Sequence, residues 1–280
     1  MRIWFITGAS RGFGSLITKE ALSAGDAVVA TARRVETLDA LGQHENLLKL
    51  ALDVTNEEQA RAAAAAAVER FGRIDVLLNN AGYGLLGAVE EATAQEIEKI
   101  YRTNVFGVLA VTRAVLPQMR RQRSGHIINI SSIGGYVAYT GWGVYGSTKF
   151  AIEGLTEALA QELAPLGIKA TVVEPGFFRT DFLDDQSLAV SPLSIPDYSE
   201  TVGAMRDFAK TANHAQPGDP ARFAKAMVQL AHADNPPLRM PFGSDTVAAI
   251  ETKNAHVADE LAAWRELAVS TDFPKESASA

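Results

Sequence analysis

Cysteine is absent from the 280 residues, which excludes disulfides, thiolate nucleophiles and thiolate metal sites. No apolar run approaches the roughly 18 residues that a membrane-spanning helix needs. The apolar start "IWFITGAS" lacks the basic segment and cleavage site of a signal peptide. The formal net charge is -7, with no long run of Lys or Arg, which argues against nucleic acid and anionic membranes as partners. We therefore expect a cytoplasmic protein.

Histidine is also scarce. The chain has 5 histidines, and no two of them stand at the spacing of metal ligands. We expect them at the surface or at the edges of elements, and we predict no metal site. They are His44, His126, His214, His232 and His256.

Short apolar segments rich in Val, Ile and Leu alternate with longer amphipathic segments. The apolar segments predict strands buried on both faces, over residues 3–7, 27–32, 47–54, 74–80, 126–131 and 168–175. Helices are predicted over residues 14–24, 57–71, 94–123 with a break near Asn104, and 144–163. This alternation indicates an α/β protein with a Rossmann-type, doubly wound parallel sheet and helices on both faces. Its site is expected beyond the carboxyl ends of the strands.

We expect a single catalytic domain over residues 1–270 and a flexible tail over 271–280. The alternation lapses from about 180 to 220, where four prolines occur, and long irregular segments of this kind are usually functional. Residues 181–218 are therefore predicted to cover the substrate. The remaining predictions are a helix near 198–212, a helix over 221–233, a short edge strand in "PPLRMPFG" and one or two closing helices over 244–267.

The loop "TGASRGFG" (7–14) joins the first predicted strand to the first predicted helix. Glycines at 8, 12 and 14 permit a tight turn and a close approach of a ligand to bare backbone, and the helix N-terminus attracts a pyrophosphate. The G-x-x-x-G-x-G spacing differs from the commoner G-x-G-x-x-G fingerprint. The position of the loop nevertheless indicates a dinucleotide.

The second strand ends in Ala32-Arg33-Arg34, where NAD-binding folds place an acid for the ribose hydroxyls. Arginines, including Arg11 of the first loop, suit a phosphate instead, so NADP(H) is favoured over NAD. Solvated arginines at a strand end are the alternative. Asp53 is suited to accept a hydrogen bond from the adenine amino group, or equally to cap the following helix.

Tyr145 and Lys149 stand four apart in a predicted helix and therefore share one face of it. At an effective dielectric of about 20, an ammonium about 4 Å from a phenol contributes about 4 kcal/mol. That corresponds to about three pK units, so Lys149 is expected to lower the pKa of Tyr145. Ser132 directly follows the fifth predicted strand and is expected to converge with them. The alternative is a surface pair without a function.

These motifs together resemble the short-chain dehydrogenase/reductase family over almost all of residues 1–180. The resemblance rests on T-G-x-x-x-G-x-G at 7–14, Asp53, N-N-A-G at 79–82, Asn104, Ser132, Y-x-x-x-K at 145–149 and P-G-x-x-x-T at 175–180. One departure is "AYTGWGVY", which lacks the proline that many relatives carry shortly before the tyrosine.

The resemblance implies a role for each matching residue. Ser132 would bind the substrate carbonyl, Tyr145 would donate the proton and Lys149 would bind the nicotinamide ribose. Asn104 would bend its helix and hold a water linked to Lys149. The implied cofactor-binding residues are Gly8, Ser10, Arg11, Gly12, Phe13, Gly14, Arg33, Arg34, Asp53, Val54, Asn80, Ala81, Gly82, Tyr145, Lys149, Pro175, Gly176, Phe178 and Thr180.

The resemblance further implies NADPH-dependent reduction of a medium-sized apolar ketone or aldehyde. NAD(P)-dependent oxidation of a secondary alcohol, such as a steroid, retinol or sugar, remains an alternative, as does a non-catalytic NADP-sensing protein. A homodimer or homotetramer formed through residues 105–123 and 145–163 is expected by analogy. The aromatic residues expected around the substrate are Tyr139, Trp142, Phe177, Phe182, Tyr198 and Phe208.

Overall fold

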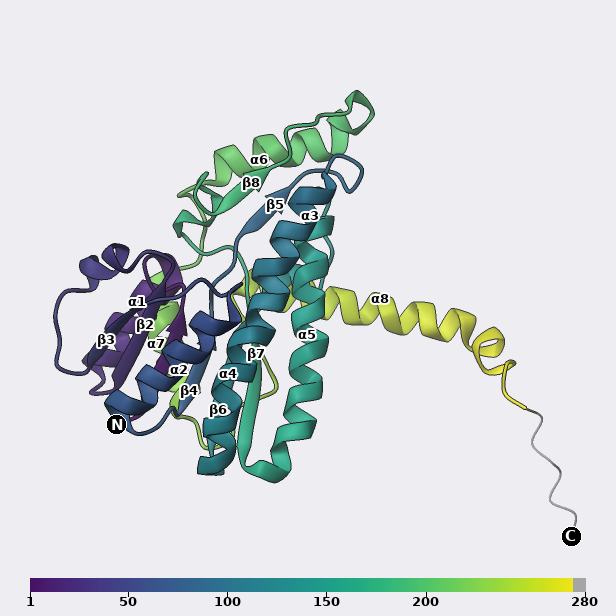
Figure 1. The fold of residues 1–280 in the computed structure, drawn as a ribbon. Coiled ribbons are helices and arrows are strands. Elements are labelled where there is room, and N and C mark those ends of the chain that lie inside the picture. The colour runs from purple at the N-terminus through teal and green to yellow at the C-terminus, as the bar shows by residue number, and fades with distance from the viewer. Residues whose placement is uncertain (274–280) are drawn as a thin grey trace, which may run out of the picture.

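The computed structural model describes residues 1–273, and within them seven strands form one sheet in the order β3-β2-β1-β4-β6-β7-β9. Every neighbouring pair in this sheet is parallel. The predicted doubly wound α/β fold is therefore confirmed (Figure 1). The strands are β1 (Ile3–Thr7), β2 (Ala27–Ala32), β3 (Leu47–Ala51), β4 (Val76–Asn79), β6 (Gly125–Ile130), β7 (Ile168–Pro175) and β9 (Arg239–Phe242).

Helices cover both faces of the sheet. Successive side chains of a strand point to opposite faces, so the apolar strands have side chains to bury on each face. Trp4 and Ile6 of β1 pack in one core cluster, whereas Phe5 packs in the other. The first cluster lies under α1 (Gly12–Ser23) and α7 (Pro220–His232), and the second lies under α2 (Glu57–Phe71), α4 (Gly107–Gln122) and α5 (Gly143–Leu163). Shorter 3-10 helices occupy Val35–Leu41, Ile133–Gly135, Ala164–Leu166, Asp181–Leu183 and Pro196–Tyr198.

Two predicted strands are shorter than expected, and one predicted helix breaks as expected. The third and fourth strands end at Ala51 and Asn79, so the polar residues that follow them belong to loops. The break near Asn104 is a π-helical turn over Arg102–Phe106, which separates α3 (Ala94–Tyr101) from α4. A π-turn of this kind often marks a functional position inside a helix.

His126 is buried in β6, so the expectation that all histidines lie at surfaces or edges is wrong. Its Nε2 lies 2.9 Å from the hydroxyl of Thr171 on β7. Burial lowers the pKa of His126 to about 3, with Lys169 and Arg2 adding to the effect, which keeps the ring neutral. The strand is covered on both faces, and a sequence pattern of isolated histidines does not reveal that covering.

The segment over residues 181–218 rises above the carboxyl edge of the sheet and contributes β8 (Leu188–Val190), a π-helical turn over Ser199–Gly203 and α6 (Ala204–Ala212) (Figure 1). β8 pairs in parallel with β5 (Gly84–Leu86) to form a separate two-stranded sheet. Neither strand was predicted, because three residues are too short for a period-2 pattern to be recognised.

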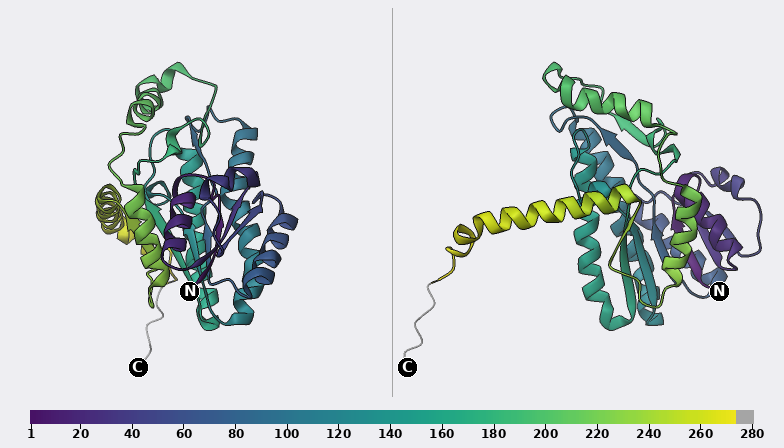
Figure 2. Two further views of the ribbon diagram at one scale, coloured as in Figure 1. Left: turned by 90° about the vertical axis from the view of Figure 1, so that its left-hand side faces the viewer. Right: turned by 180° about the vertical axis from the view of Figure 1, so that it is seen from behind.

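The final helix, α8 (Ser244–Val269), does not close over the fold as predicted. It is one helix that projects away from the sheet, and its outer part, including Leu261, Trp264 and Leu267, is exposed (Figures 1 and 2). The predicted tail over 271–280 lies mostly outside the described residues. Within residues 1–273, none of the helices is long and apolar enough to cross a membrane.

Candidate active site

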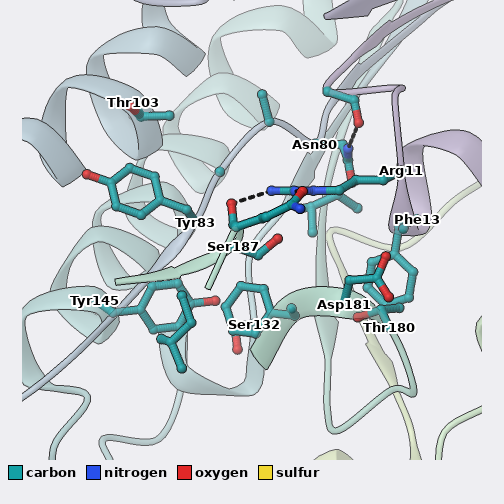
Figure 3. A pocket seen from close by; sticks show the side chains of 18 of the residues that line it. Arg11, Phe13, Asn80, Tyr83, Thr103, Ser132, Tyr145, Thr180, Asp181 and Ser187 are labelled. Carbon is teal, nitrogen blue, oxygen red and sulfur yellow. Dashed lines mark hydrogen bonds between the residues drawn. The ribbon is translucent and has the colours of Figure 1, made fainter. Parts of the chain in front are cut away.

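A cavity of about 1040 Å³ opens at the carboxyl edge of the sheet, under the segment that precedes β8. Figure 3 shows Ser132 and Tyr145 in one part of it and Arg11 and Phe13 in another. Gly14 and Asn104 lie behind the lining. The other predicted site residues line the cavity: Gly8, Ser10, Arg11, Gly12, Phe13, Arg33, Arg34, Asp53, Val54, Asn80, Ala81, Gly82, Ser132, Tyr145, Lys149, Pro175, Gly176, Phe178 and Thr180.

The first loop folds into a bare backbone cradle at the start of α1. Gly8 has a φ of 66°, in the left-handed region that favours glycine. A Cβ atom on Gly14 would overlap the carbonyl oxygen of Gly8, so the helix packs against the loop as closely as its backbone allows. The side chain of Asn80 donates hydrogen bonds to the carbonyls of Thr7 (2.9 Å) and Gly8 (3.0 Å). Asn80 therefore supports the loop from behind.

The end of the cavity next to β2 carries positive charge. No acidic residue stands at the end of that strand. Ala32 is buried, and Arg33 and Arg34 that follow it are exposed at the lining. Asp53 accepts hydrogen bonds from the backbone N–H (2.9 Å) and hydroxyl (2.8 Å) of Thr55, so it turns the chain after β3. The cap of α2 is Asn56.

Arg11 spans the cavity from the first loop to the segment over residues 181–218, called the covering segment below (Figure 3). Its guanidinium donates to the side-chain oxygen of Gln186 at 2.5 Å and to the Gln186 carbonyl. In this structure Arg11 thus joins the two walls of the cavity. Sequence reasoning did not identify Gln186, since no motif marks it and it stands 175 residues from its partner.

Tyr145, Lys149 and Ser132 meet at the floor of the cavity. Tyr145 and Lys149 lie one turn apart on α5 with exposed fractions of 6% and 7%. The Lys149 nitrogen lies 5.7 Å from the centroid of the Tyr145 ring and donates to the carbonyl of Ile130 at 2.9 Å. The Ser132 hydroxyl accepts from the N–H of Gly134 at 3.0 Å.

The expected lowering of the Tyr145 pKa is wrong for this structure. Burial raises the pKa of Tyr145 to about 12, against the opposing effect of a hydrogen bond with Ser132. Burial likewise lowers the pKa of Lys149 to about 8, and the charge of Glu153 opposes that shift. The reason is that α5 carries both groups into a desolvated site, where each neutral form is favoured, while the ammonium donates its hydrogen bond to Ile130.

Asn104 and Lys149 both approach the backbone at Gly82. Its side-chain oxygen accepts from the N–H of Tyr83 at 3.2 Å, and its amide donates to the Tyr83 carbonyl at 2.9 Å. A Cβ atom on Gly82 would lie 3.1 Å from the Asn104 oxygen and 3.7 Å from the Lys149 nitrogen. The π-turn therefore presents Asn104 to the same patch of backbone that faces Lys149.

Aromatic rings pack around Tyr145. The rings of Trp142 and Phe182 each have centroids 5.7 Å from that of Tyr145, and Tyr139 and Phe177 also line the cavity. Two of the expected aromatic residues, Tyr198 and Phe208, are not in the lining. The Tyr198 hydroxyl donates to Glu90 at 2.7 Å, and Phe208 packs edge-on against Phe177 from outside.

One group of potential metal ligands forms near the covering segment. Oxygen and nitrogen atoms of Asp181, Asp184 and His214 lie within 4.8 Å of one another. The sequence did not suggest this group because His214 stands 30 residues or more from both acids. Asp181 and His214 are exposed, and exposed acidic groups of this kind are common without an ion.

Comparisons with known proteins agree with this geometry. The family model for short chain dehydrogenases matches residues 2–190. Oxidoreductase BOA17 of Botryotinia fuckeliana is 40% identical over 275 residues, covering 96% of this chain and 99% of that protein. The 3-ketodihydrosphingosine reductase of Bacteroides thetaiotaomicron is 38% identical over 246 residues, covering 86% and 88% respectively.

Solved structures of other proteins are also similar to this chain. A short-chain dehydrogenase from Streptomyces avermitilis superposes with a TM-score of 0.90 at 41% identity, covering 97% of this chain and 100% of the other. ElxO with NADP bound superposes with a TM-score of 0.73 at 30% identity, covering 88% and 99%.

The chain belongs to the short-chain dehydrogenase/reductase family. It is an oxidoreductase that interconverts alcohol and carbonyl groups with a nicotinamide cofactor. The residues present fit such a cofactor: the first loop offers bare backbone at a helix N-terminus, and a cavity large enough for a dinucleotide runs from there to Tyr145.

Proposed function

We propose that this protein uses NADPH to reduce the carbonyl group of a medium-sized apolar ketone or aldehyde. The observation that carries the proposal is the arrangement of the cavity. One end is bounded by Arg33 and Arg34, and the other by a buried Tyr145 beneath aromatic rings. Cations at one end suit a phosphate, and aromatic rings around a few polar groups at the other end suit an apolar carbonyl compound.

We assign the cofactor to the wall formed by the loops after β1, β2, β3, β4 and β7. Bound there, NADPH supplies the hydride. The backbone of the first loop holds the pyrophosphate, and Arg33 with Arg34 holds the 2′-phosphate. Lys149 binds the nicotinamide ribose. The remaining contacts are assigned to Ser10, Arg11, Gly12, Phe13, Asp53, Val54, Ala81, Gly82, Pro175, Gly176, Phe178 and Thr180, which line that wall.

The proton is assigned to the Tyr145 hydroxyl, and Ser132 binds the carbonyl oxygen of the substrate. A pKa of about 12 keeps the phenol fully protonated at neutral pH, so the hydroxyl carries the proton that it donates before the reaction begins. Negative charge that develops on the substrate oxygen is stabilised by the two hydroxyls. The phenolate left after proton donation is stabilised by the ammonium of Lys149 in the next turn of α5.

Replacing Arg33 with alanine is expected to raise the KM for NADPH about tenfold or more, because a charged hydrogen bond to phosphate contributes about 1.5–3 kcal/mol. The KM for NADH, which has no 2′-phosphate, should stay unchanged. Steady-state kinetics with both cofactors measures the difference, and Arg33→Lys, which keeps the charge, serves as the control. Equal changes for both cofactors would show that Arg33 does not bind the phosphate.

The substrate class is tested with a panel of aryl ketones, aldehydes and steroids, each assayed with NADPH and NADH. The relative named 3-ketodihydrosphingosine reductase agrees with a ketone as the class. Fast reduction of apolar ketones with NADPH supports the proposal. The same residues catalyse the reverse reaction, so turnover of the corresponding secondary alcohols alone would favour the dehydrogenase alternative instead.

We also propose a homodimer or homotetramer formed through α4 and α5. The support is an exposed phenylalanine on each of these elements: Phe106 directly precedes α4, and Phe150 lies within α5. Phe150→Asp is expected to halve the mass measured by light scattering, since a charge does not fit a desolvated contact. Phe208→Asp, which changes an exposed phenylalanine on α6, is the control. An unchanged mass for Phe150→Asp would contradict this interface.

Location in the cytoplasm stays a prediction.

A further inference from the structure

Two carboxyl side chains lie buried behind Lys149, outside the cavity lining. Glu153 stands one turn beyond Lys149 on α5, so Tyr145, Lys149 and Glu153 share one face of the helix. Glu174 projects from β7 toward the same place. Their exposed fractions are 4% for Glu153 and 0% for Glu174. Acidic residues are rarely buried so completely unless a partner compensates their charge.

Arg239 of β9 is the partner of both carboxyl groups. Its guanidinium forms ion pairs with Glu153 and with Glu174, the latter at 3.1 Å, and reaches outward to Glu157. The ring of Tyr136 covers the guanidinium at 5.5 Å. The charged groups facing Glu153 are therefore Lys149 and Glu157 from its own helix, Glu174 from β7 and Arg239 from β9. One guanidinium does not neutralise two buried carboxylates.

Each of these two carboxyl groups also has a buried oxygen without a hydrogen-bond donor among the described residues, Oε1 of Glu153 and Oε2 of Glu174. Two ionised carboxylates offer acceptors only, so they bond to each other only when one of them carries a proton. A shared proton satisfies both oxygens and brings the buried charge of the pair down to that of one anion. Burial first, and then the neighbouring Glu174, raises the pKa of Glu153 to about 7, against the opposing effects of Ser131 and Arg239.

Ser131 connects the carboxyl pair to the catalytic helix. Its hydroxyl lies 3.5 Å from the backbone carbonyl of Lys149, and it is near enough to Glu153 to lower the pKa of that carboxyl group. A Cβ atom on Gly135 would overlap the Ser131 oxygen and lie 3.0 Å from the Lys149 Cβ, which shows how tightly this corner is packed. A continuous row of polar groups thus runs from Arg239 through the two carboxyls to the backbone of Lys149.

We propose that Glu153 is a positioning residue for the reaction: below neutral pH it shares one proton with Glu174, and at higher pH its own negative charge holds Lys149 in its ammonium form. The proposal rests on the assigned role of Lys149 but not on the identity of the substrate. Burial pulls the pKa of Lys149 down to about 8, close to physiological pH, and the charge of Glu153 is what opposes the shift. Without that charge the lysine loses its proton at a lower pH.

The shared proton is tested on the protein without cofactor or substrate. Infrared spectra at pH 6 should contain the C=O stretch of a protonated carboxylic acid, which disappears as the pH rises through about 7. Glu153→Gln and Glu174→Gln should each remove this band. Glu157→Gln, which changes the exposed partner of the same arginine, should keep it. A wild-type spectrum without the band, or a band that survives in both buried variants, would refute the pair.

The effect on Lys149 is tested with the pH profile of kcat for the ketone reduced fastest in the panel. Glu153→Gln should move the alkaline limb to lower pH by about one unit, the size of effect that a nearby charge produces. Glu174→Gln, in which Glu153 keeps its charge, and Glu157→Gln should leave the limb in place. If Glu153→Gln folds and the alkaline limb of its pH profile does not move, the proposed effect of Glu153 on Lys149 is refuted.

The infrared test needs no substrate, so its result stays valid even if the proposed substrate class is wrong.

Discussion

Replacing Tyr145 with phenylalanine is expected to lower kcat for carbonyl reduction by a factor of about 10²–10⁴, the usual contribution of a positioned general acid. The variant removes one buried hydroxyl from α5 and keeps the ring that packs against Trp142 and Phe182. The fold and the affinity for NADPH should therefore remain nearly unchanged. Stopped-flow or steady-state turnover gives the rate, and quenching of protein fluorescence by NADPH gives the affinity.

Tyr139 provides the matched control for that experiment. It lines the same cavity and is partly exposed, but it lies outside the group formed by Ser132, Tyr145 and Lys149. Tyr139→Phe should change kcat by less than about threefold, because removal of a partly exposed hydroxyl forfeits little. Turnover of Tyr145→Phe close to that of the wild type would show that another group donates the proton.

Replacing Lys149 with methionine is expected to reduce kcat at least as strongly, about 10³-fold or more, since the buried phenolate of Tyr145 loses its nearest cation. Activity of the wild type should fall as the pH rises through about 8. The direction follows from the pKa of Lys149, because the ammonium needed for catalysis is present below that pH and lost above it.

The pH profile separates a charge effect from a packing effect in this variant. Methionine fills a similar volume but does not titrate, so the residual activity of Lys149→Met should lack the limb near pH 8. Lys149→Arg, which stays charged throughout, should lack it as well. A limb at the same pH in both variants would mean that a group other than Lys149 controls it.

Features that depend on local spacing could be predicted from the sequence. Residues four apart on a helix share a face, so the pairing of Tyr145 with Lys149 followed from the pattern alone. The strands were recognisable because both faces of the sheet are covered, and the residues after them had to meet at one edge. The break at Asn104 was likewise located, and the structure adds that it is a π-turn.

Other features depend on which distant segments cover a residue. The sequence places a lysine beside a phenol, but the sign of the pKa shift at Tyr145 is decided by burial beneath Trp142 and Phe182. The bridge from Arg11 to Gln186 joins residues 175 positions apart. The neutral His126 arises because neighbouring strands and both helical layers exclude water from β6.

The sequence by itself thus determined the class of fold, the order of the motifs and the face of α5 that carries Tyr145 and Lys149, because these depend on periodicities of two and 3.6 residues. Only the tertiary structure decided the outward course of α8 and the meeting of Glu153 with Glu174 and Arg239. For the two carboxyl groups the physical reason is desolvation. The free energy of a charge depends on every segment that displaces water around it, and those segments come from distant parts of the chain.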